Sequence, residues 1–296
     1  MEHPLPRLSR ARAELTRSVD AVDEFGAVRH IAIPAERALT VYVDKVELVT
    51  LMTLGAQPEL LVLGFLRNQR LVQSVFDIES ITVDWDVGAA AVKTRHGVAD
   101  LPAKTAQRVV TTGCGQGSMF GNLMADVHGV SLAPAVLAQQ QLYGIVNAIR
   151  LADSTYKSAG SVHGCGLFRG DELLMFVEDV GRHNAIDTIA GWMWLQADDA
   201  ALPGKSPARG SGMQGSDKVF YTTGRLTSEM VIKAAQMGVP IVISRSGITE
   251  MGLQIARQLG LCTVGRAINK HFLCFSAPHR LQLQPATAGP RLRAVA

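Results

Sequence analysis

The sequence is poor in cysteine, has almost no excess of charge of one sign and contains no long uninterrupted apolar run. Its 4 cysteines in 296 residues are too few for a disulfide scaffold, and no two of them have the spacing of a zinc knuckle. The 29 basic and 26 acidic residues leave a net charge of +3, which argues against a protein that coats nucleic acid or an anionic membrane. Charged side chains interrupt the most apolar stretch, residues 39–66, and no signal peptide precedes it. We therefore expect a cytoplasmic protein with neither a nucleic-acid nor a membrane partner.

The composition is that of a folded protein, because 47% of the residues are hydrophobic and can bury a large core. The length permits one large domain or two moderate ones. Residues 1–28 and 277–296 lack sustained apolar periodicity, and the second stretch is rich in Pro, Ala and Arg. Both ends are therefore predicted to be disordered tails.

Residues 29–130 are predicted to form a β-rich N-terminal part. Short apolar or alternating runs separated by turn residues are typical of strands. The segment 58–66 fits either a strand or a helix, so both assignments stay open there. The runs of strand type cover residues 39–43, 61–65, 81–83, 89–92 and 109–112.

Residues 131–276 alternate strand and helix patterns, which predicts a parallel sheet covered by helices. The part begins with a long helix over residues 132–152, with Pro134 in its first turn. The segment 203–216, rich in Gly, Ser and Pro, is expected to be an inserted loop. The predicted strands cover residues 173–177, 219–222, 241–243 and 261–264, and the helices between them cover residues 186–193, 228–237 and 249–259.

An arginine follows each of three predicted parallel strands: Arg225, Arg245 and Arg266. Ligands of open α/β sheets bind outside the carboxyl ends of the strands, where these residues are expected to lie. Guanidinium groups beside the N–H groups of helix N-termini suit a polyanion such as a diphosphate. The alternative is that they are ordinary surface arginines at loop ends. The recurrence favours an anion site.

A second cluster of polar residues, Glu178 to Asn184, lies in the turn between a predicted strand and a predicted helix. It contains Asp179, Arg182 and His183, which are more ionisable side chains than a simple connection between a strand and a helix requires. Carboxylates near a helix start also serve as partners of the helix dipole, and a single histidine is often structural. Because the cluster shares a sheet edge with the arginines, we expect Arg182 and His183 to contribute to the site, with Asp179 and His183 orienting the ligand or tuning protonation.

Cys114 is the best candidate nucleophile. It follows a predicted strand in the run Gly113-Cys114-Gly115-Gln116-Gly117, where small neighbours leave the thiol accessible to another molecule. Cys262 and Cys274 fall within predicted strands and fit the core, whereas the role of Cys165 stays open.

A metal site is not expected. His163 and Cys165 offer two ligand types, but the chain has neither the H-x-E or C-x-E motif nor the P-C-x-x-C motif of a zinc deaminase. The run from Gly210 to Gly215 matches G-x-G-x-x-G, but it precedes a predicted strand and therefore cannot place a helix N-terminus on a pyrophosphate.

Between residues 28 and 276 the chain resembles the accessory sulfurtransferases required for formate dehydrogenase activity (FdhD). The run Glu178-Asp-Val-Gly-Arg-His-Asn-Ala is highly specific for that family. Further matching runs are Ser161-Val-His, Thr223-Gly-Arg, Lys233-Ala-Ala, Gly238-Val-Pro and Leu261-Cys-Thr-Val-Gly-Arg. The resemblance implies a homodimer and a cytidine-deaminase-like α/β fold, a three-layer sheet with helices on both faces and no catalytic zinc, preceded by the smaller β-rich part.

The resemblance also implies a function. The family takes sulfur from a cysteine desulfurase as a cysteine persulfide and delivers it to the bis-molybdopterin guanine dinucleotide molybdenum cofactor before formate dehydrogenase receives that cofactor. The persulfide cysteine of the family matches Cys114, and guanine nucleotides such as GDP are expected to mimic the cofactor. The cofactor-binding stretch of the family matches Arg266, Ala267, Ile268, Asn269, Lys270 and His271.

One departure keeps other functions open. The family loop has the form C-G-x-C-G, but Gly117 stands where the second cysteine is usual, so a relay between two loop thiols is absent. Ile268 and Asn269 also replace the basic and glycine residues that are frequent in the family. One alternative is a non-catalytic chaperone that binds and inserts the molybdenum cofactor. Another is a cysteine hydrolase that acts on a nucleotide with Cys114 and His183.

Overall fold

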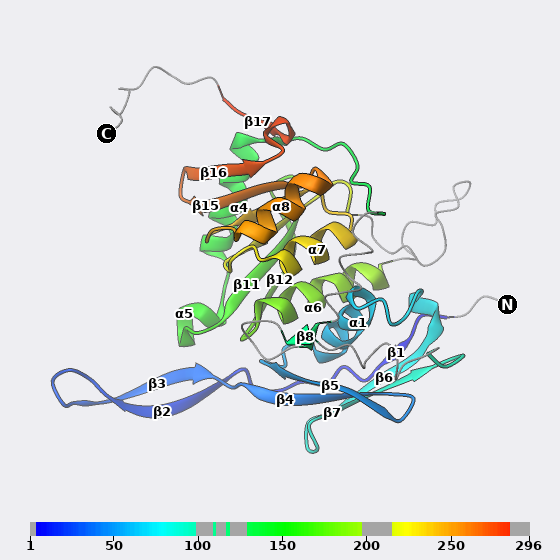
Figure 1. The fold of residues 1–296 in the computed structure, drawn as a ribbon. Coiled ribbons are helices and arrows are strands. Elements are labelled where there is room, and N and C mark those ends of the chain that lie inside the picture. Colours follow the sequence, from blue (N-terminus) through cyan, green and yellow to red (C-terminus); the bar gives the residue numbers. More distant parts are fainter. Residues whose placement is uncertain (1–3, 99–108, 111–116, 119–128, 197–214, 285–296) are drawn as a thin grey trace.

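The computed structural model describes residues 4–98, 109–110, 117–118, 129–196 and 215–284. They form two main sheets with helices between and around them (Figure 1). Cys114 and most of the segment 203–216 lie outside the described residues.

The first main sheet is five-stranded and lies in the N-terminal part. Helix α1, Pro58–Asn68, packs its apolar side chains onto this sheet, so the helical assignment of residues 58–66 is correct and the strand assignment is wrong. Pro58 stands in the first turn, where a missing N–H costs no hydrogen bond. The strands in spatial order are β1 (Arg7–Leu8), β6 (Ile78–Asp84), β7 (Ala89–Thr94), β4 (Arg37–Val43) and β5 (Val46–Thr53).

The predicted disordered tails are wrong where the structure describes them. Strands β2, Thr16–Val22, and β3, Val28–Pro34, form an antiparallel hairpin that extends beyond the five-stranded sheet to α5, Thr155–Ala159 (Figure 1). At the other end, strand β17, Leu281–Gln282, pairs with β10, Leu137–Ala138.

The C-terminal segment is also held by a buried side chain. The Arg280 guanidinium, in the 3-10 turn Pro278–Arg280, donates to the carbonyl oxygens of Ala133 at 2.6 Å and Gly260 at 2.9 Å. These bonds anchor a stretch whose composition alone predicts disorder.

The second main sheet is six-stranded and mixed. Only β13, β14 and β15 run parallel, whereas β11 pairs antiparallel with both β12 and β13, and β16 pairs antiparallel with β15. The expectation of a parallel sheet is therefore correct for β13, β14 and β15 and wrong at both edges. In spatial order the strands are β12 (Glu172–Asp179), β11 (His163–Arg169), β13 (Lys218–Thr222), β14 (Ile241–Ser244), β15 (Cys262–Ile268) and β16 (His271–Ser276).

Helices cover both faces of this sheet, which confirms the α/β class and the three layers. Phe220 and Val242 point to a core with α6 (Arg182–Leu195), α7 (Ser228–Gln236) and α8 (Glu250–Leu259). Their strand neighbours Val219, Tyr221, Ile241 and Ile243 point to the opposite core, with α4 (Gln139–Leu151). Helix α4 begins later than predicted, because residues 137–138 pair as β10.

Helix α6 also packs against α1 of the N-terminal part, and two glycines allow the close crossing. A Cβ atom added to Gly64 would lie 1.7 Å from the Asp187 carbonyl oxygen, and one added to Gly191 would lie 2.0 Å from that of Leu60. At these positions the backbones of α1 and α6 touch, so no side chain fits. The two parts of the chain are thus joined through one buried helix.

Candidate functional site

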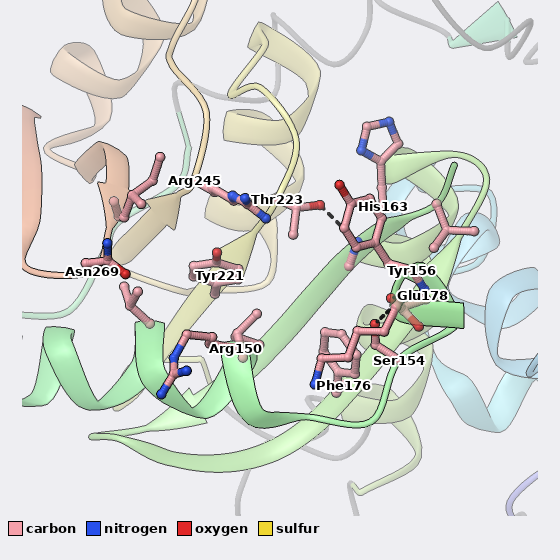
Figure 2. Close-up of a pocket in the computed structure, with 17 residues that line it drawn as sticks. Arg150, Ser154, Tyr156, His163, Phe176, Glu178, Tyr221, Thr223, Arg245 and Asn269 are labelled. Atoms are coloured by element: carbon pink, nitrogen blue, oxygen red, sulfur yellow. Dashed lines mark hydrogen bonds between the residues drawn. The ribbon is translucent and has the colours of Figure 1, made fainter. Parts of the chain in front are cut away.

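A pocket of about 490 Å³ opens where the carboxyl ends of the parallel strands meet α4, α5 and the hairpin β15–β16 (Figure 2). In this view Tyr221 lies between Arg245 and Arg150, with Phe176 and Glu178 on the side of α5. Three cationic side chains, Arg150, Lys157 and Arg245, line the pocket. Its other lining residues are Val146, Ile149, Ser154, Tyr156, Val162, His163, Gly164, Phe176, Glu178, Tyr221, Thr223, Ala267, Ile268 and Asn269.

The three loops that carry the predicted arginines are joined by backbone hydrogen bonds. The Arg245 N–H donates to the Thr222 carbonyl at 3.0 Å, and the Arg266 N–H donates to that of Ser246 at 2.6 Å. The Ser244 hydroxyl donates to the Gly224 carbonyl at 2.7 Å. The structure therefore places Arg225, Arg245 and Arg266 at one edge, all with exposed side chains, and Arg245 lines the pocket.

The predicted stretch 266–271 divides at the turn between β15 and β16. Ala267, Ile268 and Asn269 line the pocket, whereas Lys270 and His271 are exposed and lie outside its lining. Arg266 and Asn269 adopt positive φ angles of 53° and 55°, so the backbone bends sharply on both sides of Ala267. These bends bring the end of β15 against the pocket.

Basic groups surround His163, whose ring lies beside the loop that carries Gly224. Burial lowers the pKa of His163, and the positive charges of Arg182 and Arg225 lower it further, so the imidazole is neutral at pH 7. A Cβ atom added to Gly224 would approach Arg182 Cδ at 2.9 Å and His163 Nδ1 at 3.5 Å, which places the three residues in contact range. The predicted Arg182 is therefore buried beside Gly224, close to His163, and does not itself line the pocket.

Asp179 stabilises the fold and does not line the pocket. Its buried carboxylate accepts hydrogen bonds from the Thr53 hydroxyl at 2.5 Å, the Leu54 N–H at 3.1 Å, the Gly181 N–H at 3.0 Å and the Asn184 amide at 2.8 Å. Burial raises its pKa, whereas these donors oppose that rise. The carboxylate thus ties β5 to the start of α6.

Glu178, the neighbour of Asp179, supports the pocket directly. Its carboxylate accepts hydrogen bonds from the N–H groups of Thr155 and Tyr156, the first residues of α5. Because Tyr156 and Lys157 line the pocket, this carboxylate fixes one of its walls. The sequence marks Glu178 as part of a polar cluster, but nothing in it reveals the helix that Glu178 holds.

His183 is buried on α6 and does not line the pocket, contrary to the expectation that it orients the ligand. Its Nε2 lies 3.3 Å from a Glu229 carboxylate oxygen, and Lys233 lies 3.2 Å from the other oxygen. Burial lowers the pKa of His183 to about 3, although Glu229 acts in the opposite direction. The neutral ring is part of the packing between α6 and α7.

The burial of His183 predicts a loss of stability on acidification. Below its ordinary pKa of 6.5 the unfolded chain binds a proton that the folded protein excludes until about pH 3. The native free energy of unfolding should therefore fall by about 2 kcal/mol more than that of His183→Gln between about pH 7 and about pH 5. Urea titrations at both pH values measure this difference. The exposed His279→Gln variant should behave as the native chain, and equal slopes in all three proteins would contradict the assignment.

The described cysteines differ in environment. Cys165 is buried in the core of the second sheet, and its thiol donates to the Thr222 hydroxyl at 3.4 Å. Burial raises the pKa of Cys165 to about 12, so it is an unreactive core residue. Cys262 is buried as predicted, whereas Cys274 is only half-buried.

The segment that holds Cys114 connects two short paired strands. Strand β8, Val109–Val110, covers the first half of the predicted strand 109–112 and pairs antiparallel with β9, Gly117–Ser118. Cys114 itself lies outside the described residues, so its role stays a prediction.

The fold and the pocket define a mixed α/β protein with a basic cavity at the carboxyl ends of its parallel strands. The chain belongs to the FdhD/NarQ family, whose model matches residues 34–282. This match confirms the family to which the sequence motifs point.

Relatives of the same family match most of the chain. This chain is 29% identical over 249 residues to the sulfur carrier protein FdhD of Bacillus subtilis strain 168. The matched region covers 83% of this chain and 89% of that protein. The chain is 30% identical over 248 residues to the sulfur carrier protein FdhD of Bacillus pumilus strain SAFR-032, with coverage of 83% and 88%.

A solved structure confirms the fold. It is the crystal structure of a putative formate dehydrogenase accessory protein from Desulfotalea psychrophila, with a TM-score of 0.68 and 23% identity over 90% of this chain and 98% of that one.

Within the described residues, no helix is both long and apolar enough to cross a membrane.

Proposed function

We propose that this protein is a sulfur carrier that accepts sulfur on Cys114 and delivers it to a molybdenum cofactor for a formate dehydrogenase. The observation that carries the proposal is the family match over residues 34–282, together with relatives named sulfur carrier proteins. The proposed partners are a cysteine desulfurase, the catalytic subunit of a formate dehydrogenase and a second copy of the chain. The proposed compartment is the cytoplasm.

The proposed loading step is a thiol–persulfide exchange. The Cys114 thiolate attacks the outer sulfur of a cysteine persulfide on the desulfurase, and the desulfurase thiolate leaves. The products are a Cys114 persulfide and a free desulfurase thiol, so no external oxidant is needed. Glycines on both sides of Cys114 allow the donor to approach. Because position 117 is glycine, the second thiol of the usual loop takes no part.

The basic pocket is the proposed site for a guanine nucleotide of the bis-molybdopterin guanine dinucleotide cofactor. Arg150, Lys157 and Arg245 supply positive charge for a diphosphate, and Tyr221 and Phe176 supply aromatic surface for a base. The pocket volume of about 490 Å³ lies in the range of small-molecule sites. Arg225, Arg266, Lys270 and His271 lie outside the lining and are proposed to meet the parts of the cofactor that extend beyond it.

Sulfur loading is tested by the intact mass of the protein after incubation with a cysteine desulfurase and free cysteine, without reductant. The native chain should gain one sulfur atom that dithiothreitol removes, and Cys114→Ala should gain none at that site. Cys165→Ala is the matched control, because it removes a buried thiol and should load as the native chain does. Peptide mapping assigns the sulfur to its cysteine. A native chain that gains no sulfur on Cys114 would overturn the proposed sulfur transfer.

The absence of a second loop cysteine favours one alternative function, a non-catalytic chaperone that binds and inserts the molybdenum cofactor. In that case Cys114→Ser would still support maturation of the dehydrogenase at the native level. For a sulfur carrier, the same variant loses maturation while it still binds the cofactor. The third idea, a hydrolase that pairs Cys114 with His183, finds no support, because His183 is buried outside the pocket.

Nucleotide binding depends on Arg245 if the pocket holds the guanine nucleotide. Arg245→Ala should raise the Kd of GDP by about 10- to 100-fold, because a charge-assisted hydrogen bond contributes about 1.5–3 kcal/mol. Isothermal titration calorimetry with GDP measures the change. Arg257→Ala on α8 is the matched control, since Arg257 is exposed and lies outside the pocket lining. Equal losses in both variants would mean that only the general charge of the protein matters.

A further inference from the structure

Cys262 and Cys274 lie close together on adjacent strands, away from the Cys114 segment in sequence. Val264 of β15 pairs directly with Cys274 of β16, so these two side chains point to the same face of the sheet. Cys262 stands two residues before Val264 and therefore shares that face. Both cysteines pack into the core on the α4 side, Cys262 fully buried and Cys274 half-buried. One thiol of the pair is thus sheltered, and the other is accessible to a small reagent.

We propose that Cys262 and Cys274 form a redox-active dithiol, which a hydroperoxide oxidises to a disulfide that links β15 to β16. The placement of both cysteines on the same face of adjacent, hydrogen-bonded strands and in one core carries this proposal, since a disulfide requires neighbouring sulfur atoms on adjacent backbone segments. The proposal is independent of the role of Cys114.

The two thiols differ in exposure and in pKa. The Cys274 thiol donates to the Ser276 carbonyl at 3.3 Å, and a hydrogen bond from the Cys262 thiol lowers the pKa of Cys274 to about 7, although burial acts against this shift. The same hydrogen bond raises the pKa of Cys262, and burial raises it further. Because Cys274 is half-buried whereas Cys262 is fully buried, we assign Cys274 as the attacking thiolate and Cys262 as the resolving thiol, the arrangement expected of an oxidation-sensitive pair.

The proposed oxidation proceeds in two steps. The Cys274 thiolate attacks one oxygen of hydrogen peroxide, the O–O bond breaks, and a Cys274 sulfenic acid and water form after proton uptake. The Cys262 sulfur then attacks the Cys274 sulfur, and a second water leaves as the disulfide forms. Two thiols lose two electrons in total, which the peroxide accepts.

The disulfide would fix the hairpin that carries part of the pocket wall. Strand β15 continues from Cys262 to Ile268, and the turn that follows holds Asn269. Ala267, Ile268 and Asn269 line the pocket, and β16 returns from this turn to Cys274. A covalent link between the two strands therefore restrains the segment that borders the ligand cavity.

The test uses full-length Cys114→Ala protein, so that the most accessible predicted thiol is absent. Reduced protein is treated with hydrogen peroxide and its intact mass is measured before and after dithiothreitol. We expect a loss of two hydrogen masses that dithiothreitol reverses, and peptide mapping should join Cys262 to Cys274. Unchanged mass, or a disulfide that includes Cys165, would overturn the proposal.

Two further variants in the same background separate the roles of the thiols. With Cys262→Ala the disulfide cannot form, and dimedone should trap a sulfenic acid on Cys274. Alkylation of Cys274 by iodoacetamide at neutral pH should also slow several-fold, because the hydrogen bond to its sulfur is lost. With Cys274→Ser both the mass loss and the dimedone adduct should disappear, while circular dichroism shows a folded protein. A dimedone adduct that persists in Cys274→Ser would overturn the assignment of Cys274 as the attacking thiol.

Discussion

Replacement of Gly191 by alanine should lower the free energy of unfolding by about 3 kcal/mol or more. A Cβ atom at this position would lie 2.0 Å from the Leu60 carbonyl oxygen and 2.9 Å from the Gly64 N–H nitrogen. Both neighbours are backbone atoms of α1, so no side-chain rotation relieves the overlap. The helices α1 and α6 must separate, and the core that joins the two parts of the chain loosens.

Denaturant titration followed by circular dichroism measures this loss. Gly247→Ala is the matched control, because a Cβ atom there meets nothing within 4 Å and the φ angle of Gly247 is not positive. The control should unfold at the same denaturant concentration as the native chain. If Gly191→Ala unfolds there as well, the close approach of α1 and α6 is not a feature of the folded protein.

The sequence pattern predicts the parallel region of the second sheet closely. Strands β13, β14 and β15 and helices α7 and α8 lie near their predicted bounds, because buried strands give continuous apolar runs and glycines follow both helices. The direction of β12 could not be predicted, since an apolar run has no polarity of its own. Gly170, at a positive φ of 59°, turns the chain so that β12 returns antiparallel to β11.

The N-terminal hairpin could not be predicted for a different reason. Val22, Val28 and Ile31 are exposed, and neither β2 nor β3 has a regular alternation of polar and apolar residues or a buried face. Strand prediction from periodicity needs one face that is shielded from water. Because β2 and β3 pair only with each other within the described residues, neither face of the hairpin is buried and no apolar face is visible in the sequence.

The candidate site could be predicted where residues follow the carboxyl ends of parallel strands. It could not be predicted where contacts between side chains distant in sequence determine the position of a residue. The placement of Arg225, Arg245 and Arg266 follows from parallel strands that end at one edge. His183 is buried against Glu229 of α7, and the residues next to His183 in the sequence do not indicate that contact. The pocket residues Arg150 and Tyr221 come from a helix end and a strand whose patterns indicate only packing.

Replacement of Lys233 by methionine should lower the free energy of unfolding by about 3–5 kcal/mol. Lys233 is fully buried, and its ammonium donates to the Asp187 carboxylate at 2.8 Å and lies 3.2 Å from a Glu229 carboxylate oxygen. Burial alone would lower the pKa of Lys233, but the two carboxylates raise it above its ordinary value. Without the ammonium, the Asp187 and Glu229 carboxyl groups remain in the core between α6 and α7 and lose the cation that both of them contact.

The surface pair Lys93–Glu79 provides the control, because its N–O distance is also 2.8 Å while the Lys93 side chain is 65% exposed. Lys93→Met should leave the denaturation midpoint nearly unchanged, since water screens an exposed ion pair. Lys233→Arg, which keeps the positive charge, should be less destabilised than Lys233→Met if charge balance dominates. Equal effects of Lys233→Met and Lys93→Met would show that burial does not strengthen the Lys233 interactions. A large effect of Lys233→Met alone would show that this buried network stabilises the contact between α6 and α7.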